Sequence, residues 1–310
     1  MFLKFIFFLF SFVIQGIFAV NFDFVSLKDF SSVAPELNVF KARDGENLSF
    51  RIYDSSGSEN VFIMIHGSAY HGVYLHAMAD FLSANNVASV CLPNLRGHFE
   101  SGSVRGDCLY EGQLEDDLVD LISHLGWGKK NIFLGGHSSG AGLAIRFAGS
   151  KYQNMIKGYL LFSPIVPSAG GVKTDWVNVS IAKILGITFL NAIGISRFNH
   201  AHVISFNMPE KFMTGTETLS YSYNLNASIH PRFDFKPDID GLKDNYVVLA
   251  GTQDEVFNQD IFDKVFGSSK RSHLRFVHDV KHLDIVQNEK TFELIKYFIS
   301  GDLIVIEPER

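Results

Sequence analysis

The segment Gly136-His137-Ser138-Ser139-Gly140 constrains the fold more than any other part of the chain. It follows the apolar run Asn131–Gly135 and opens the helix-like run Ala141–Ala148. A G-x-S-x-G pattern between a strand and a helix is typical of a nucleophile elbow, a sharp turn that exposes its serine. Gly136 and Gly140 are expected to be needed sterically, and Ser138 is the candidate nucleophile. A glycine-rich turn without a catalytic role is the alternative.

Short apolar runs alternate with amphipathic stretches along most of the chain. Predicted strands are Leu37–Lys41, Leu48–Tyr53, Val61–Ile65, Ala88–Leu92, Asn131–Gly135, Gly158–Phe162, Tyr246–Ala250 and His273–Val277. Predicted helices are Leu75–Asn85, Leu114–Leu125, Ser139–Gly149, Val256–Phe266 and Leu283–Ile299. This alternation predicts an α/β fold with a mostly parallel eight-stranded sheet and helices on both faces.

The alternation breaks once, between Ser163 and Leu242. A structureless loop of that length inside a compact domain is improbable. We therefore expect an inserted cap with its own helices after the sixth strand, at about residues 164–240. No internal repeat is visible in the sequence.

A second glycine turn, His66-Gly67-Ser68, ends the predicted strand Val61–Ile65. An oxyanion formed on a carbonyl carbon by serine attack needs two N–H donors. One donor comes from the residue after the nucleophile, here Ser139, and the other from the loop after the third strand. Ser68 is the candidate for the second donor. A tight strand end with a structural histidine is the alternative.

Two later loops carry the candidate acid and base. In Gly251-Thr252-Gln253-Asp254-Glu255 an acid follows a buried strand, and Asp254 is chosen over Glu255 to orient a histidine. His282, in Val280-Lys281-His282, is the candidate base because the unperturbed pKa of histidine lies near working pH. A helix-capping role for the aspartate and a solvated histidine are the alternatives. The order serine, acid, histidine is the order found in α/β-hydrolase triads.

The first nineteen residues differ from the rest. A short start containing Lys4 precedes the apolar run Phe5–Ile14, and Ala19 offers a small residue for cleavage. This pattern predicts a signal peptide at residues 1–19 and a mature domain at residues 20–310, exported to a periplasm, a lumen or the exterior. An uncleaved membrane anchor is the alternative. No later segment resembles a transmembrane span. After export, Cys91 and Cys108 either pair or remain buried thiols.

Composition excludes some partners. Charged residues make up 19% of the 310 residues and the formal net charge is −6. That balance gives no basic footprint, so nucleic acid is not an expected partner. Two cysteines also make a cysteine-rich metal site an unlikely feature, and no metal is assigned. The oligomeric state is left open.

Taken together, these motifs resemble the α/β-hydrolase superfamily. Within it the chain is similar to the monoacylglycerol lipase, lysophospholipase and serine aminopeptidase-like branch. Leu95-Arg96-Gly97-His98 adds to the resemblance, although Phe99 stands where that branch has a glycine. The resemblance spans about residues 45–299 apart from the cap. It implies no cofactor and a cap that sets substrate choice.

The expected reaction is acyl transfer through Ser138 to water. The apolar stretch Val179–Ile195 in the predicted cap favours a small-molecule carboxylic ester with an apolar, lipid-like acyl group, such as a monoacylglycerol or a lysophospholipid. Packing of that stretch against the body explains it equally well. Hydrolysis of an amide or peptide is the alternative within enzymes, and an inactive homologue that only binds a ligand is the alternative outside them.

Overall fold

The computed structural model describes residues 21–28, 30–170, 175–257, 259–267 and 273–301. The predicted signal peptide, residues 1–19, lies outside the described residues. No helix in the described ranges is both long enough and apolar enough to span a membrane.

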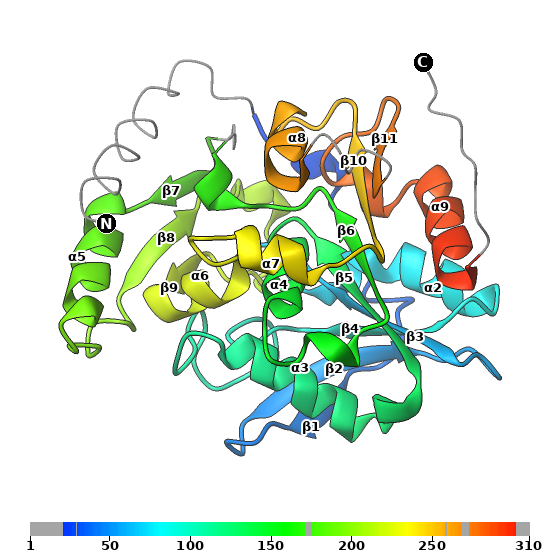
Figure 1. The fold of residues 1–310 in the computed structure, drawn as a ribbon, viewed down its shortest axis with the longest axis horizontal. Coiled ribbons are helices and arrows are strands. Elements are labelled where there is room, and N and C mark those ends of the chain that lie inside the picture. Colours follow the sequence, from blue (N-terminus) through cyan, green and yellow to red (C-terminus); the bar gives the residue numbers. More distant parts are fainter. Residues whose placement is uncertain (1–20, 29, 171–174, 258, 268–272, 302–310) are drawn as a thin grey trace.

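An eight-stranded sheet forms the centre of the molecule (Figure 1). Its strands lie in the order β1-β2-β4-β3-β5-β6-β10-β11. Pairings of β1 with β2 and of β2 with β4 are antiparallel, and the other pairings are parallel. The bounds are β1 Asn38–Lys41, β2 Asn47–Tyr53, β3 Asn60–Ile65, β4 Ser89–Pro93, β5 Asn131–His137, β6 Gly158–Phe162, β10 Tyr246–Gly251 and β11 Leu274–Val277. The predicted fold class and all eight predicted strands are confirmed.

Helices cover both faces of this sheet. Side chains alternate across a strand, so Ile63 and Ile65 of β3 pack into one core while Phe62 and Met64 pack into the other. The first core includes side chains of α3 (Gln113–His124), α4 (Ser139–Ala148) and α8 (Asp260–Phe266), and the second includes those of α2 (His76–Ala84) and α9 (Glu289–Ser300). Two buried faces explain why the parallel strands read as continuous apolar runs.

Two predicted helices begin later than their sequence pattern suggests. The helix predicted from Val256 begins at Asp260, and the N–H groups of Val256 and Phe257 donate to the Asp254 carboxylate in the loop before it. The helix predicted from Leu283 is divided into a 3-10 turn, Asp284–Val286, and α9. The side chain of Asn288 accepts from the Lys290 N–H and caps the new helix.

The insertion between β6 and β10 forms a lobe beside the sheet, on the left in Figure 1. It contains an antiparallel sheet of β7 (Val177–Val179), β8 (His202–Phe206) and β9 (Ser220–Ser222). Three helices accompany it: α5 (Ile181–Ala192), α6 (Tyr223–Ile229) and α7 (Lys236–Gly241). The helices match the expectation of a cap with helical segments, whereas the small sheet was not predicted.

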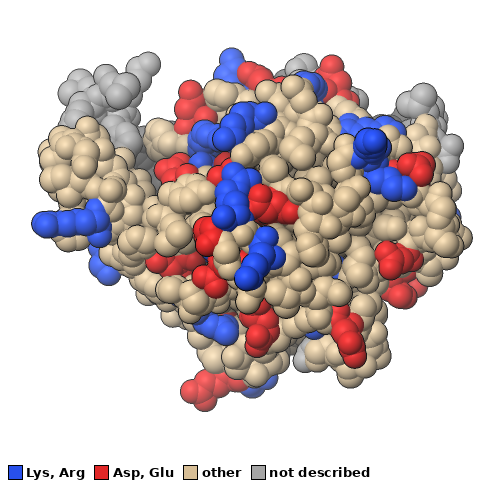
Figure 2. Space-filling model, turned by 90° about the horizontal axis from the view of Figure 1, so that it is seen from below, with Lys and Arg blue, Asp and Glu red and all other residues tan. Residues whose placement is uncertain are grey.

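Charged side chains are unevenly distributed over the face in Figure 2. Acidic and basic residues are interspersed over the body, but the lobe that carries α5 is mostly uncharged there. Phe189 and Ile193 of this region are 54% and 57% exposed.

Both cysteines are buried free thiols. Cys91 lies within β4, paired with Ile52 and Ile63 of the neighbouring strands. Burial raises the pKa of the Cys108 thiol to about 12. Of the two possibilities left open by the sequence, the structure has the unbridged one.

Candidate active site

Ser138 occupies the sharp turn between β5 and α4. Its φ and ψ of 57° and −119° are unusual for a residue with a side chain. Strain of this kind costs about 1–3 kcal/mol and persists only where the surroundings enforce it. Here the Ser138 N–H donates to the Phe162 carbonyl at 2.9 Å, and the Ser138 carbonyl accepts from Gly142 and Ile165. The turn therefore has the backbone geometry predicted for a nucleophile elbow.

The two glycines of the motif are needed for close backbone packing. A Cβ on Gly140 would lie 2.4 Å from the carbonyl oxygens of both Ile65 and His66, and one on Gly136 would lie 2.5 Å from that of Ile65. Since real Cβ atoms do not approach backbone oxygens so closely, any larger residue would push the elbow away from the end of β3. The glycines thus bring Ser138 against the loop that follows β3.

The loop after β3 presents the predicted oxyanion donor. The N–H of Gly67 donates to the Tyr74 hydroxyl at 2.7 Å, and the N–H of Ala69 donates to the Tyr221 hydroxyl at 2.6 Å. Between them, the Ser68 N–H has no acceptor among the described residues. The Ser68 and Ser139 hydroxyls are joined by a 2.9 Å hydrogen bond, so the two predicted donor residues lie next to each other.

Ser139 is the first residue of α4, where backbone N–H groups lack helical partners and the helix dipole is positive. A substrate oxygen beside Ser138 would meet this N–H and that of Ser68. The oxyanion roles of both residues remain a prediction, which this geometry supports.

Asp254 and His282 lie together, as the sequence predicts. Nδ1 of His282 lies 2.9 and 3.1 Å from the two carboxylate oxygens of Asp254. Ser163 donates to the same carboxylate at 2.7 Å, as does the Val256 N–H at 3.0 Å. Burial alone would raise the pKa of Asp254, but the charge and hydrogen bonds of His282 and the Ser163 bond hold it below the usual value. An ionised Asp254 holds the proton on Nδ1 and leaves Nε2 to act as the base.

Glu255 has a different task from its neighbour. Its Oε2 accepts from the backbone N–H of His282 at 3.0 Å and does not contact the imidazole through a hydrogen bond. This contact fixes the backbone of the base. The choice of Asp254 over Glu255 as the orienting acid therefore agrees with the geometry.

Ser138 and His282 line the same cavity. Their side chains are nearly buried, and the Ser138 hydroxyl makes no hydrogen bond within the described part of the chain, to His282 or to any other residue. Catalytic hydrogen bonds are often long in the absence of substrate. The three predicted triad residues thus meet at one place through one formed hydrogen-bonded pair and one shared cavity.

A chain of buried hydrogen bonds connects the loop after β3, the elbow and the loop that carries His282. The Tyr74 hydroxyl, which accepts from Gly67, also lies 2.9 Å from Nδ1 of His137. Nε2 of His137 lies 2.9 Å from the carbonyl oxygen of His282. Burial lowers the pKa of His137 to about 3, so its ring stays neutral and relays these bonds without a charge.

The cavity has a volume of about 620 Å³ and mostly apolar walls. The lining includes Trp176, Ile184, Leu185 and Phe206 from the insertion and Val256 from the loop after β10. The size falls in the usual range for small-molecule sites. Phe22, Phe24 and Leu27, from the start of the described chain, also line it.

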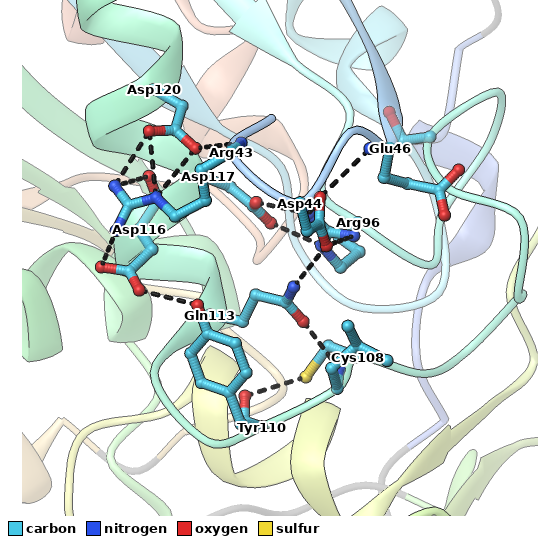
Figure 3. Close-up of polar contacts among 12 residues, drawn as sticks. Arg43, Asp44, Glu46, Arg96, Cys108, Tyr110, Gln113, Asp116, Asp117 and Asp120 are labelled. Carbon is cyan, nitrogen blue, oxygen red and sulfur yellow. Dashed lines mark hydrogen bonds and ion pairs between the residues drawn. The ribbon is translucent and has the colours of Figure 1, made fainter. Parts of the chain in front are cut away.

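The Arg-Gly-His motif, Arg96-Gly97-His98, holds the loop after β4 in place near the candidate site. Arg96 is buried and binds the Asp117 carboxylate through two nitrogens at 2.8 and 2.7 Å, with Asp44 at 3.0 Å (Figure 3). The motif histidine, His98, places Nε2 2.9 Å from the Tyr221 hydroxyl. Arg96 therefore anchors the loop after β4. His98 connects that loop to the loop after β3, which carries Ser68, through the Tyr221 hydroxyl.

Sequence reasoning missed several residues of this site: Ser163, Tyr74, Tyr221, Phe22 and Phe24. It considered Glu255 only as a competitor of Asp254, not as a partner of the His282 backbone. Ser163 follows β6 directly, and its position at the end of a central parallel strand was a usable signal. Tyr221 and the two phenylalanines come from segments without a recognisable motif, so only the tertiary structure reveals their contacts.

Comparisons with known proteins agree with this architecture. The sequence profile of the family described as serine aminopeptidase, S33, matches residues 57–210. No curated protein matches the chain.

Solved structures resemble it over most of its length. A monoglyceride lipase from Saccharomyces cerevisiae has a TM-score of 0.64 at 14% identity, with 88% of this chain and 97% of the lipase covered. A monoacylglycerol lipase from Paleococcus ferrophilus has a TM-score of 0.60 at 18% identity, with 82% and 99% covered. An esterase from Thermogutta terrifontis has a TM-score of 0.57 at 19% identity, with 86% and 98% covered.

These similarities at low identity establish the fold, and the family profile covers the region from the loop before β3 through the elbow into the insertion. Together with the elbow, the hydrogen-bonded Asp254–His282 pair and the shared cavity, they lead to one conclusion: this chain has the α/β-hydrolase fold, and over residues 57–210 its sequence is similar to the serine aminopeptidase, S33, family of hydrolases.

Proposed function

We propose that the chain is a serine hydrolase that cleaves a carboxylic ester with an apolar acyl group. The observation that carries the proposal is the position of Ser138, which lies on a strained elbow in an apolar cavity that it shares with His282. The hydrogen bonds between His282 and Asp254 support the role of the histidine as base.

The proposed reaction has two steps. Nε2 of His282 takes the proton of Ser138 as its oxygen attacks the ester carbonyl, and the N–H groups of Ser68 and Ser139 bind the oxyanion. The protonated His282 then gives its proton to the leaving alcohol, which departs and leaves an acyl-enzyme. A water molecule, deprotonated by the same histidine, then attacks the acyl carbon. The bond to Ser138 breaks, His282 returns the proton to the serine oxygen, and the acid is released. Each oxyanion donor is expected to lower the activation barrier by about 3 kcal/mol.

The walls of the cavity favour an ester over a peptide. Recognition of a peptide amino terminus needs a carboxylate that is free to bind an ammonium group. Glu111 is the one acid among the described lining residues, and its Oε1 already pairs with Nη2 of Arg146 at 3.0 Å. An apolar acyl chain needs no such partner. The Saccharomyces cerevisiae lipase, solved with a substrate analogue, and the Thermogutta terrifontis esterase are also consistent with an ester.

Two alternatives remain distinct from this proposal. An amidase or peptidase is suggested by the family profile. A ligand-binding protein without turnover would use the same cavity but would not need the Asp254–His282 pair.

A panel of p-nitrophenyl esters from acetate to palmitate, measured beside amino-acyl p-nitroanilides, separates the esterase, the peptidase and the binding protein. We expect turnover that rises with acyl length and is lost in Ser138→Ala. Turnover of anilides alone would favour the peptidase, and no turnover of any kind would favour the binder.

We further propose that the protein is exported by the N-terminal leader. The proposal rests on the sequence pattern of residues 1–19. Amino-terminal sequencing of the protein from its native cell should begin at about Val20. A chain that retains its apolar start would support the membrane-anchored alternative.

A further inference from the structure

The described chain begins with a short segment that packs against the candidate active site. Residues Phe22–Leu27, here termed the N-terminal strap, include a 3-10 turn, Phe24–Ser26. In Figure 1 this dark blue segment lies beside α8 and β10, away from β1. The segment precedes residues 57–210, which match the family profile, so the matched region does not account for it.

Polar contacts hold the strap to the two loops that carry the acid and the base. The Asp23 N–H donates to Oε1 of Glu255 at 3.2 Å, and the Asp23 carboxylate pairs with Nζ of Lys281 at 2.7 Å. The side-chain amide of Gln287 donates to the Ser26 carbonyl at 2.8 Å. These partners lie more than 200 residues away in sequence, so the strap is placed by tertiary contacts.

One carboxylate joins the strap to the candidate base. Glu255 accepts from Asp23 with Oε1 and from the backbone N–H of His282 with Oε2. The position of the strap relative to His282 is therefore fixed by two hydrogen bonds to a single side chain.

The aromatic side chains of the strap face the cavity. The centroid of the Phe22 ring lies 5.9 Å from that of His282 and 5.0 Å from that of Trp176. Phe24 lies 5.5 Å from Trp176. All four side chains line the cavity, whereas Val25, between the two phenylalanines, is 75% exposed and does not.

We propose that the N-terminal strap is a specificity-determining wall of the active site, in which Phe22 and Phe24 limit the space that an acyl chain finds beside His282. The inference rests on the proposed esterase function and names the part of the chain that sets the length of the acyl group. Removing a ring opens space, and each additional CH₂ group that the substrate buries there raises kcat/KM about fourfold.

The experiment compares four variants of the full chain: Phe22→Ala, Phe24→Ala, Phe22→Trp and the matched control Val25→Ala. For each, kcat/KM is measured over the p-nitrophenyl ester series. We expect the two alanine variants at Phe22 and Phe24 to shift the preferred acyl chain to greater length, Phe22→Trp to shift it to shorter length, and Val25→Ala to match the wild type. Unfolding temperatures identify any variant that has lost its fold. If an alanine variant unfolds, Phe22→Trp still tests the inference.

Binding of a fluorescent fatty acid series in the Ser138→Ala background provides a readout that requires no catalysis. A length shift in binding for Phe22→Ala, with no ester turnover by the wild type, would remove the proposed function and retain the strap as a cavity wall. An unchanged length profile in both turnover and binding, or a shift equally large in Val25→Ala, would overturn the inference.

Discussion

Replacing Gly140 by alanine perturbs the elbow with a single methyl group. The added Cβ would lie 2.4 Å from the carbonyl oxygens of Ile65 and His66, both of which are backbone atoms at the end of β3. To lengthen this distance from the added Cβ to the carbonyl oxygens to about 3 Å, which is still tight, the elbow and the end of β3 must separate by about 0.6 Å. Overpacking of this kind costs about 1–3 kcal/mol of stability.

The effect on catalysis should be about as large, as a free energy, as the effect on folding. A displacement approaching 1 Å between reacting groups costs up to about 100-fold in rate, so we expect kcat for a p-nitrophenyl ester to fall about 10- to 100-fold. Gly128→Ala is the matched control, because its Cβ would meet nothing within 4 Å. Steady-state kinetics and urea unfolding on both variants test the reasoning. A Gly140→Ala protein with wild-type kcat would refute the claim that the elbow is held by backbone packing.

Three further predictions follow from individual contacts. Tyr221→Phe removes the acceptor of the Ala69 N–H and should lower stability by about 1–3 kcal/mol and kcat by about 10-fold. Tyr159→Phe should be neutral, because the buried Tyr159 hydroxyl has no hydrogen-bond partner among the described residues; urea unfolding and kinetics compare the two variants. Asp254→Asn should lower kcat by about 10³–10⁴-fold, because an amide neither stabilises the imidazolium nor fixes its tautomer; a loss under tenfold would argue against the role of this acid. Burial lowers the pKa of His137 to about 3 and that of His66 to about 4, so below about pH 6.5 the unfolded chain binds protons that the folded chain does not. The free energy of unfolding should then fall by up to about 1.4 kcal/mol per pH unit for each histidine as the pH drops toward 4, and a flat profile from pH 7 to 5 in denaturant titrations would contradict this.

The central sheet could be predicted because each strand is buried on both faces. Such strands need continuous apolar residues. A short apolar run such as Gly158–Phe162, between amphipathic helical stretches, therefore predicts a buried parallel strand. The elbow could be predicted for a related reason. Its glycines are required by close backbone contacts, so the sequence motif itself indicates the sharp turn.

The walls of the site could not be predicted in the same way. Phe22 and Tyr221 reach the site through contacts with residues far away in sequence, and nothing in their own neighbourhood indicates a partner. The three-stranded sheet of the insertion has short strands, of which β7 is largely exposed, so it leaves a weak pattern. The start of the last helix was misplaced because the Asn288 side chain caps a new helix at Glu289, after the predicted start at Leu283.

Covalent labelling of Ser138 tests the central claim most directly. The wild-type protein is treated with a fluorophosphonate, and the modified residue is identified by mass spectrometry of its peptides. We predict one adduct, on Ser138, that is lost in Ser138→Ala and forms more slowly in His282→Ala. Full labelling of Ser138→Ala, or an adduct on another residue in the wild type, would contradict the account.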